Sequence, residues 1–279
     1  KFLRDFKIDE VEGLILDLRN NGGGYLHEAD SLTRLFINYG PTVQIKSPNS
    51  DVIIYNSWKS KKSWNKPLVV LVNKFSASAS EIFAGAMQDY NRAIIVGQTT
   101  FGKGSVQRFT ETDYGQIKIT DSLYYRVTGE PTQIFGVEPE LKIPSLIDGD
   151  GLGEDRYENA IKPSRIDKST FFKNDDFNIE LFLANHQKRL DESEYFVQMN
   201  FLKDFRENNR EKLSLNIADR RLDYEENKNR NLRLINLGRE ISGEDLFEDY
   251  DEYLNREVND DFVIDAEIDQ SLEILIDLI

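Results

Sequence analysis

Three closely spaced serines and one lysine are the residues of this sequence whose types best support covalent chemistry. Ser76, Ser78 and Ser80 follow an apolar run at 67–73 and precede a stretch with helical periodicity, and Lys103 stands among glycines further along. A turn from strand to helix can expose a hydroxyl beside unpaired backbone amides, and a lysine can take the hydroxyl proton without a histidine. The pattern indicates a nucleophilic serine with a lysine base. The residues alone do not select among the three serines.

A glycine run at 22–24 follows the apolar stretch 13–18 and could bind a negatively charged oxygen. Consecutive glycines let the main chain approach a ligand closely, and amides at the start of a helix lack partners. Taken alone, the run is explained as a tight turn that needs glycine for its dihedral angles. Together with a candidate nucleophile and base, it indicates an oxyanion-binding loop.

Other catalytic chemistries find less support in the sequence. His27 and His186 are the only histidines, and no Gly-x-Ser-x-Gly elbow accompanies either, so a histidine-based triad is not predicted. The segment 97–104 is similar to a P-loop, but Gly104 follows the lysine where that motif needs Ser or Thr. No spacing of His, Asp or Glu matches a zinc or calcium motif. We therefore expect neither a metal nor another cofactor.

Composition narrows the range of partners. The 279-residue chain has no cysteine and a formal net charge of −15. Because no basic stripe is present, we expect no nucleic-acid partner. No run approaches the roughly 18 apolar residues of a membrane span, so we also expect no membrane span in this segment. The lack of cysteine excludes disulfides and thiolate chemistry but leaves the cellular compartment open.

The hydrophobic pattern predicts two structural regions. Apolar runs at 13–18, 68–72 and 93–96 alternate with helical periods, which is typical of an α/β fold with a partly parallel sheet. After the glycine-rich acidic stretch near residue 150, leucine and charged residues recur at helical spacing. We predict an α/β core (mixed sheet with helices) followed by a mostly α-helical C-terminal domain. Its predicted parts are a core at 1–147, a linker at 148–165 and a helical C-terminal extension at 166–279.

Five motifs follow one another in the order Asp17–Gly24, Ser76–Asp89, Arg92-Ala93, Thr100–Gln107 and Gly136–Pro139. In type and order they resemble the motifs of the carboxyl-terminal processing, or tail-specific, serine proteases of peptidase family S41. The helical remainder is similar to the C-terminal extension of the large bacterial tail-specific branch. The resemblance implies a protease core that is partial here, because family members carry further core structure and a peptide-binding PDZ domain before the segment that opens this chain.

The resemblance also selects among the residues left open above. Matched motif to motif, the nucleophile falls on Ser78 and the general base on Lys103. The two amides that would hold the oxyanion fall on Gly24 and Ala79.

Two further residues are implied by the same motifs. Gln107 follows the base by four positions, and we expect it to orient the lysine by a hydrogen bond. Asp89 lies eleven residues after Ser78, which on a helix is a separation of about 16 Å. We therefore expect Asp89 to have a supporting, structural role.

The function that the resemblance implies is that of a serine endopeptidase. It would cleave proteins near their C-termini through a Ser/Lys dyad and an acyl-enzyme, without a cofactor. Its partners would be protein or peptide substrates with apolar or unfolded C-termini and an adaptor protein, in the periplasm or cell envelope of a bacterium. Two alternatives stay open: a non-catalytic peptide-binding or scaffold module on the same fold, and a Ser/Lys esterase or amidase.

Overall fold

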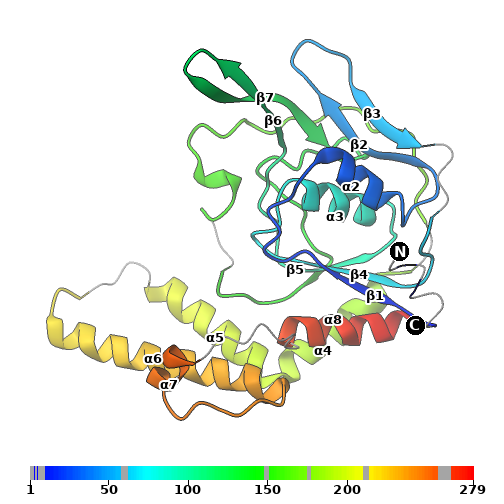
Figure 1. The fold of residues 1–279 in the computed structure, drawn as a ribbon. Helices are drawn as coiled ribbons and strands as arrows, with labels where there is room; N and C mark the ends of the chain where they lie inside the picture. Colours follow the sequence, from blue (N-terminus) through cyan, green and yellow to red (C-terminus); the bar gives the residue numbers. More distant parts are fainter. Residues whose placement is uncertain are drawn as a thin grey trace.

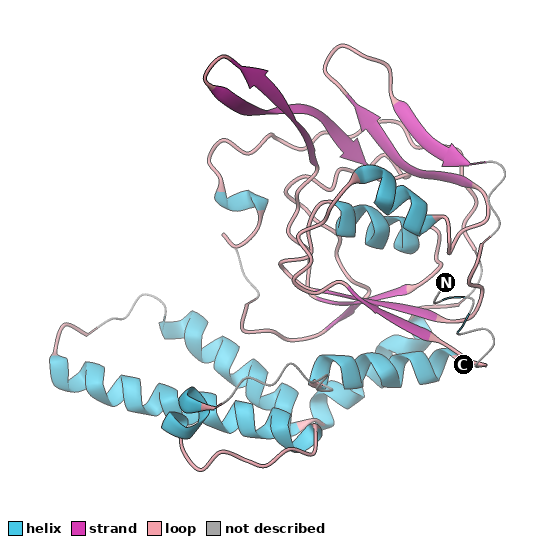
Figure 2. Cartoon of the chain, in the orientation of Figure 1, coloured by secondary structure: helices cyan, strands magenta, loops and turns pink. Residues whose placement is uncertain are grey.

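The molecule consists of an α/β region and a helical region, as the sequence predicts (Figure 1, Figure 2). The computed structural model describes residues 3, 5, 10–57, 62–147, 151–174, 177–209, 214–256 and 265–279. The strands are β1 (Leu14–Asp17), β2 (Gly40–Lys46), β3 (Ile53–Ser57), β4 (Leu68–Val72), β5 (Ile94–Gly97), β6 (Ser105–Thr112), β7 (Gly115–Tyr125) and β8 (Leu141–Lys142). The helices are α2 (Leu26–Thr33), α3 (Ala79–Asp89), α4 (Glu180–Glu192), α5 (Glu194–Asn209), α6 (Ile217–Ile241), α7 (Tyr250–Asn255) and α8 (Ala266–Leu278).

A parallel sheet with the strand order β1-β4-β5-β8 forms the centre of the α/β region. All five residues of β4 are buried. A strand covered on both faces needs apolar residues without alternation, and the sequence of β4 has this composition. The parallel arrangement also brings the carboxyl ends of β1, β4 and β5 to one edge of the sheet, where the loops carrying the candidate site residues begin.

Helices cover both faces of the parallel sheet. Successive residues of a strand point to opposite faces, so Val70 packs in the cluster that contains Phe83 of α3, and Leu71 packs in the cluster that contains Ile274 of α8. In Figure 1, α2 and α3 lie on one side of the sheet, and α4 and α8 lie on the other. The C-terminal region therefore supplies one of the two layers that bury the central sheet.

A second, antiparallel sheet has the order β3-β2-β7-β6. It packs on α3 from the side opposite the parallel sheet, through a cluster that includes Val43, Ile82 and Tyr124. The β6–β7 hairpin extends away from the body of the molecule in Figure 1. Helix α3 is thus held between two sheets, and most of its residues are buried.

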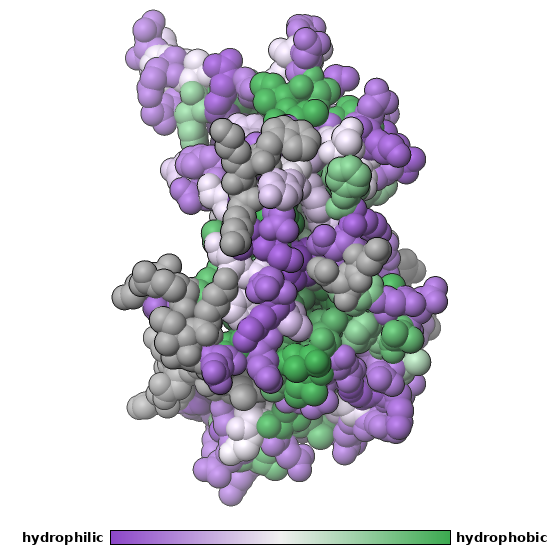
Figure 3. Space-filling view, turned by 90° about the vertical axis from the view of Figure 1, so that its right-hand side faces the viewer, coloured by the Kyte–Doolittle hydropathy of each residue, from purple (hydrophilic) through white to green (hydrophobic). Residues whose placement is uncertain are grey.

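The helices α5 to α7 form the part of the C-terminal region that extends away from the α/β region (Figure 1). Buried side chains of α5 and α6, including Leu202 and Leu234, form a separate small cluster. On the face shown in Figure 3, hydrophilic side chains predominate and apolar patches lie between them. Among the described helices, none has both the length and the apolar composition that crossing a membrane requires.

The described part of the predicted linker runs along the α/β region. The amide of Glu154 donates to the carbonyl of Phe101 at 2.9 Å, and the hydroxyl of Ser164 lies 2.9 Å from the hydroxyl of Tyr125. Residues 148–150 of the predicted linker lie outside the described residues. The division into core, linker and extension stays a prediction.

Candidate active site

Ser78 stands at the turn that joins β4 to α3. It is the residue before the first turn of α3, and its φ of 58° and ψ of −113° are unusual for a residue with a side chain. Residues in sparsely populated backbone regions gather at functional sites, where the surrounding structure holds them in place. The conformation of Ser78 has the features of a nucleophile elbow, a sharp strand-to-helix turn that presents a hydroxyl.

The hydroxyls of the two neighbouring serines have structural partners. Ser76 is fully buried; its Oγ donates to the carbonyl of Leu18 at 2.7 Å and accepts from the amide of Asn73 at 3.0 Å. The Oγ of Ser80 donates to the carbonyl oxygen of Asn21 at 3.1 Å. Ser78 is partly exposed, which distinguishes it from both neighbours.

Glu81 links the backbone of Ser78 to the backbone of Lys103. Its Oε2 accepts from the Ser78 amide at 2.7 Å and from the Lys103 amide at 2.9 Å. Its Oε1 accepts from the Thr100 hydroxyl at 2.6 Å and from the Gly102 amide at 2.7 Å. The carboxylate is fully buried, and burial raises the pKa of Glu81 to about 7 although these four donors oppose the increase.

Tyr124 of β7 makes a second link between the same two residues. Its hydroxyl donates to the carbonyl oxygen of Lys103 and lies 3.1 Å from the carbonyl oxygen of Ser78. Burial raises the pKa of the Tyr124 phenol well above its usual value, so it stays a hydrogen-bond donor. Two side chains thus bring together the main chains of residues that are 25 positions apart in the sequence.

Neither side chain is among the site residues that the sequence predicts. A signal for Glu81 was present, because Ser78-x-x-Glu81 has the spacing of a capping box. No comparable signal marks Tyr124, which reaches the site from another sheet.

Close backbone packing explains the glycines on either side of Lys103. A side chain at position 102, where φ is +90°, would begin 2.6 Å from the carbonyl oxygen of Ile134. A side chain at position 104 would begin 2.6 Å from the amide nitrogen of Gln133. Lys103 itself is partly exposed. The Gly-Lys-Gly pattern therefore lets the segment after β5 pack tightly while the lysine stays accessible.

The loop of residues 20–24, here called the glycine loop, packs directly on the turn that holds Ser78. A side chain at position 23 would begin 2.6 Å from the carbonyl oxygen of Ala77 and 2.8 Å from the amide nitrogen of Ala79. The Ala77 amide also donates to the carbonyl of Asn21 at 3.0 Å. Gly24 is exposed beside this contact. The glycine loop and the Ala79 amide are neighbours, as an oxyanion-binding site requires.

The two remaining predicted residues are Asp89 and Gln107. Asp89 is at the opposite end of α3, where its buried carboxylate pairs with Arg126 and ties the helix to the end of β7. Gln107 lies on β6 opposite Thr120, and its side chain is exposed. The role predicted for Gln107 stays a prediction.

The histidines occupy other environments. His27 is exposed on α2, and its nearest charged partner is Glu28 at 3.5 Å. His186 is buried in α4, where its ring nitrogens bond to the carbonyl of Lys142 at 2.8 Å and to the side chain of Gln270 at 2.9 Å. Burial lowers the pKa of His186. Within the described ranges, no group of three or more His, Asp or Glu side chains could hold a metal ion.

Comparisons with known proteins place this chain among peptidases. Residues 1–143 match the model of peptidase family S41, and residues 147–279 match the model described as the C-terminal domain of tail specific protease (DUF3340). The chain is 34% identical to the tail-specific protease of Haemophilus influenzae, an alignment that covers 96% of this chain and 41% of that protein. It is 41% identical to the carboxy-terminal-processing protease of Bartonella bacilliformis, over 48% of this chain and 32% of that protein.

Among solved structures, the photosystem II D1 C-terminal processing protease is 36% identical, with a TM-score of 0.47 over 51% of this chain and 37% of that one. The chain spans about two fifths or less of the length of these relatives.

Proposed function

Because the chain belongs to peptidase family S41, we propose that it is the part of a serine endopeptidase that carries the Ser78/Lys103 dyad and cleaves proteins near their C-termini. The observation that carries this proposal is the double link between the main chains of Ser78 and Lys103. Glu81 accepts from both amides, and the Tyr124 hydroxyl donates to the carbonyl of Lys103 and lies 3.1 Å from the carbonyl of Ser78. Such a link has a clear use if the lysine amine must take the proton of the serine hydroxyl.

In the proposed reaction, neutral Lys103 takes the proton of the Ser78 hydroxyl as Oγ attacks the scissile carbonyl. The carbonyl oxygen becomes negatively charged and is held by the amides of Gly24 and Ala79. Collapse of this intermediate breaks the C–N bond, and the protonated lysine returns its proton to the leaving amine. Water then hydrolyses the acyl-serine by the same steps and restores the free hydroxyl.

The other residues of the site have positioning roles in this scheme. Glu81 and Tyr124 fix the relative position of nucleophile and base, and Gln107 is proposed to orient the lysine. Asp89 is proposed to act at a distance by holding α3 against the antiparallel sheet through Arg126. Thr100 orients Glu81 and also accepts from the Val137 amide at 2.7 Å.

The proposed substrates are proteins or peptides with unfolded, apolar C-termini, delivered by an adaptor protein. The proposed location is the periplasm or cell envelope of a bacterium. The Haemophilus and Bartonella relatives, which are bacterial proteases, support the bacterial part of this proposal.

The test is cleavage of an unfolded protein with an apolar C-terminus by the full-length gene product. The products are identified by mass spectrometry, and the Ser78→Ala variant is assayed beside the wild type. We expect internal cuts that accumulate from the C-terminal side and that are absent in the variant. Binding of the substrate without cleavage would favour a scaffold module. Hydrolysis of esters or small amides with no cleavage of the protein would favour an esterase or amidase.

A further inference from the structure

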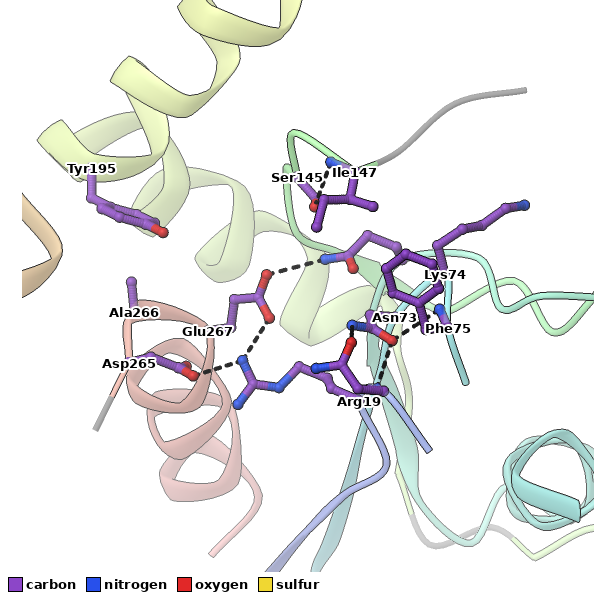
Figure 4. A pocket seen from close by; sticks show the side chains of 12 residues that line it. Arg19, Asn73, Lys74, Phe75, Ser145, Ile147, Tyr195, Asp265, Ala266 and Glu267 are labelled. Atoms are coloured by element: carbon purple, nitrogen blue, oxygen red, sulfur yellow. Dashed lines mark hydrogen bonds and ion pairs between the residues drawn. The ribbon is translucent and has the colours of Figure 1, made fainter. Parts of the chain in front are cut away.

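Arg19 joins the end of β1 to the beginning of α8 (Figure 4). Its Nη2 lies 2.8 Å from Asp17 Oδ2, while its Nη1 lies 2.7 Å from Asp265 Oδ2 and 2.8 Å from Glu267 Oε2. The guanidinium is mostly buried, with 15% of the side chain exposed. The group of Arg19, Asp17, Asp265 and Glu267 is called the Arg19 cluster below.

Helix α8 offers a fixed point for this cluster. Ile274 and Leu275 of α8 are buried in the hydrophobic core that covers one face of the parallel sheet. Asp265 caps the helix by accepting from the Ile268 amide at 2.8 Å. Glu267 also accepts from the side chain of Gln98, which follows β5, at 3.3 Å. The first turn of α8 is therefore held by its own cap, by the sheet and by the loop after β5.

The end of β1 has fewer backbone hydrogen-bond partners than the strands inside the sheet. β1 is at the edge, and within the described sheet it pairs with β4 alone. Directly after Arg19, Asn20 has a φ of 58°, a conformation that needs support from its surroundings. Asn73 provides part of this support, since its Oδ1 accepts from the Asn20 amide at 2.9 Å. Arg19 provides an attachment to the C-terminal region.

From Arg19 the glycine loop leads within a few residues to Ser78. Asn21 accepts from the Ala77 amide at 3.0 Å, and Gly23 packs against the Ala79 amide nitrogen. A displacement at the end of β1 would therefore move the loop whose Gly24 amide is proposed to hold the oxyanion.

A cavity of about 240 Å³ lies beside the Arg19 cluster. Residues of the α/β region, including Asn73 and Phe75, form one side, and Tyr195 of α5 and Ala266 of α8 lie on the other (Figure 4). Because the two regions do not pack closely around this space, polar contacts carry the connection at this point. These are the ion pairs of Arg19 and the hydrogen bond from Gln98 to Glu267. The loop has room to shift if these contacts are lost.

We propose that Arg19 is a positioning residue that anchors the glycine loop to α8, so that the C-terminal region helps to set the geometry of the oxyanion site. This inference rests on the proposed function, because it assigns Arg19 a part in the same reaction. Arg19 does not touch the substrate; it acts through the loop that follows it.

The test compares Arg19→Gln with Arg189→Gln in the full-length gene product. Arg189 of α4 pairs with Asp277 of α8 at 2.7 Å, so the control also removes an ion pair to α8, but at the other end of the helix. Steady-state cleavage of an unfolded protein is measured below the melting temperature of both variants. We expect Arg19→Gln to lower kcat about ten- to a hundredfold with KM nearly unchanged, because misplacement of catalytic groups affects the transition state. Arg189→Gln should keep the kcat of the wild type.

A third variant asks whether Arg19 acts through α8. Glu267→Gln should also lower kcat, but by a smaller factor than Arg19→Gln does. The kcat of the double variant Arg19→Gln/Glu267→Gln should be no lower than that of Arg19→Gln alone. Equal kcat values for Arg19→Gln and Arg189→Gln, a loss confined to KM, or additive losses in the double variant would each overturn the inference. Ser78→Ala, run in parallel, separates the two proposals. Activity in Ser78→Ala would refute the proposed dyad. If Ser78→Ala is inactive, the kcat values of the Arg19 variants decide whether Arg19 is a positioning residue.

Discussion

At the scale of single residues, the problem posed by the sequence is that Ser76, Ser78 and Ser80 have the same chemistry. The structure separates them by their partners. Ser76 and Ser80 use their hydroxyls to hold β1 and the glycine loop to the turn before α3, and Ser78 stands partly exposed with a strained backbone. The neighbouring serines are explained as supports of the turn.

This assignment predicts opposite effects for neighbouring substitutions. Ser78→Ala should abolish cleavage with little change in stability. Ser76→Ala should keep much of the activity but lower the free energy of unfolding by about 1–3 kcal/mol, because the Leu18 carbonyl and the Asn73 amide lose a buried partner. Ser80→Ala should behave like Ser76→Ala. Cleavage assays and urea denaturation on the three variants decide the point, and full activity in Ser78→Ala would refute the assignment.

Glu81 leads to a prediction about pH. Its pKa is about 7 in the folded state and 4.5 for an unperturbed side chain, so the folded state binds the proton more tightly between these values. Stability contributed by this group therefore falls as pH rises from about 4.5 to 7, by roughly 3 kcal/mol in total.

The check is urea denaturation of the wild type and Glu81→Gln at pH 5, 6 and 7. We expect the stability advantage of the wild type over the variant to narrow as pH rises. An advantage that stays constant from pH 5 to 7 would contradict this prediction, because it would mean that the four donors offset burial and that the pKa of Glu81 is not raised.

At the scale of helices and strands, the local hydrophobic pattern predicted several elements of the α/β region. The apolar runs at 13–18, 68–72 and 93–96 correspond to β1, β4 and β5, and the stretch with helical periodicity after the three serines corresponds to α3. Periodicity could not show that α3 lies between two sheets or that α8 covers the far face of the parallel sheet. Those contacts join residues distant in the sequence, and many faces of similar hydrophobicity could meet.

The position of α8 predicts which of its apolar residues stabilise the molecule. Leu275 is buried against the parallel sheet next to Gly13, where a Cβ would lie 2.7 Å from the leucine side chain. Leu275→Ala should lower the free energy of unfolding by about 2–5 kcal/mol. The matched control is Ile276→Ala on the same helix, because Ile276 is 54% exposed and should change stability by about 0.5 kcal/mol or less. Equal losses in the two variants would contradict the packing described here.

At the scale of the whole molecule, the C-terminal region both completes the core and reaches the loop next to the candidate site. The sequence predicted a helical extension after a linker. A capping-box spacing marked Glu81, but no pattern indicated that Glu81, Tyr124 or Arg19 connects distant segments. Each of these side chains joins segments at least 20 positions apart or belonging to different sheets. A sequence motif records which residues are present, whereas these links depend on how the segments meet.

The relatives are longer than this chain, which leads to a prediction about activity. Binding energy from remote parts of a substrate orients the reacting bond, so a peptide-binding PDZ domain should increase turnover. We expect the 279-residue chain alone to cleave an unfolded protein far more slowly than a longer protein in which a further core segment and a PDZ domain are joined to it. Equal specific activity of the two on one substrate would show that residues 1–279 suffice for catalysis.

The most direct test of the central claim, that Ser78 is a nucleophile activated by Lys103, is covalent labelling followed by peptide mapping. A fluorophosphonate probe reacts when a serine oxygen attacks phosphorus and fluoride leaves, so the adduct marks the activated hydroxyl. In the full-length gene product, we expect the adduct on Ser78. Labelling should be lost in Lys103→Ala and equally in Lys103→Arg, because a guanidinium stays protonated and cannot accept the serine proton. An adduct on Ser76 or Ser80, or undiminished labelling of Ser78 in Lys103→Arg, would contradict the Ser78/Lys103 dyad.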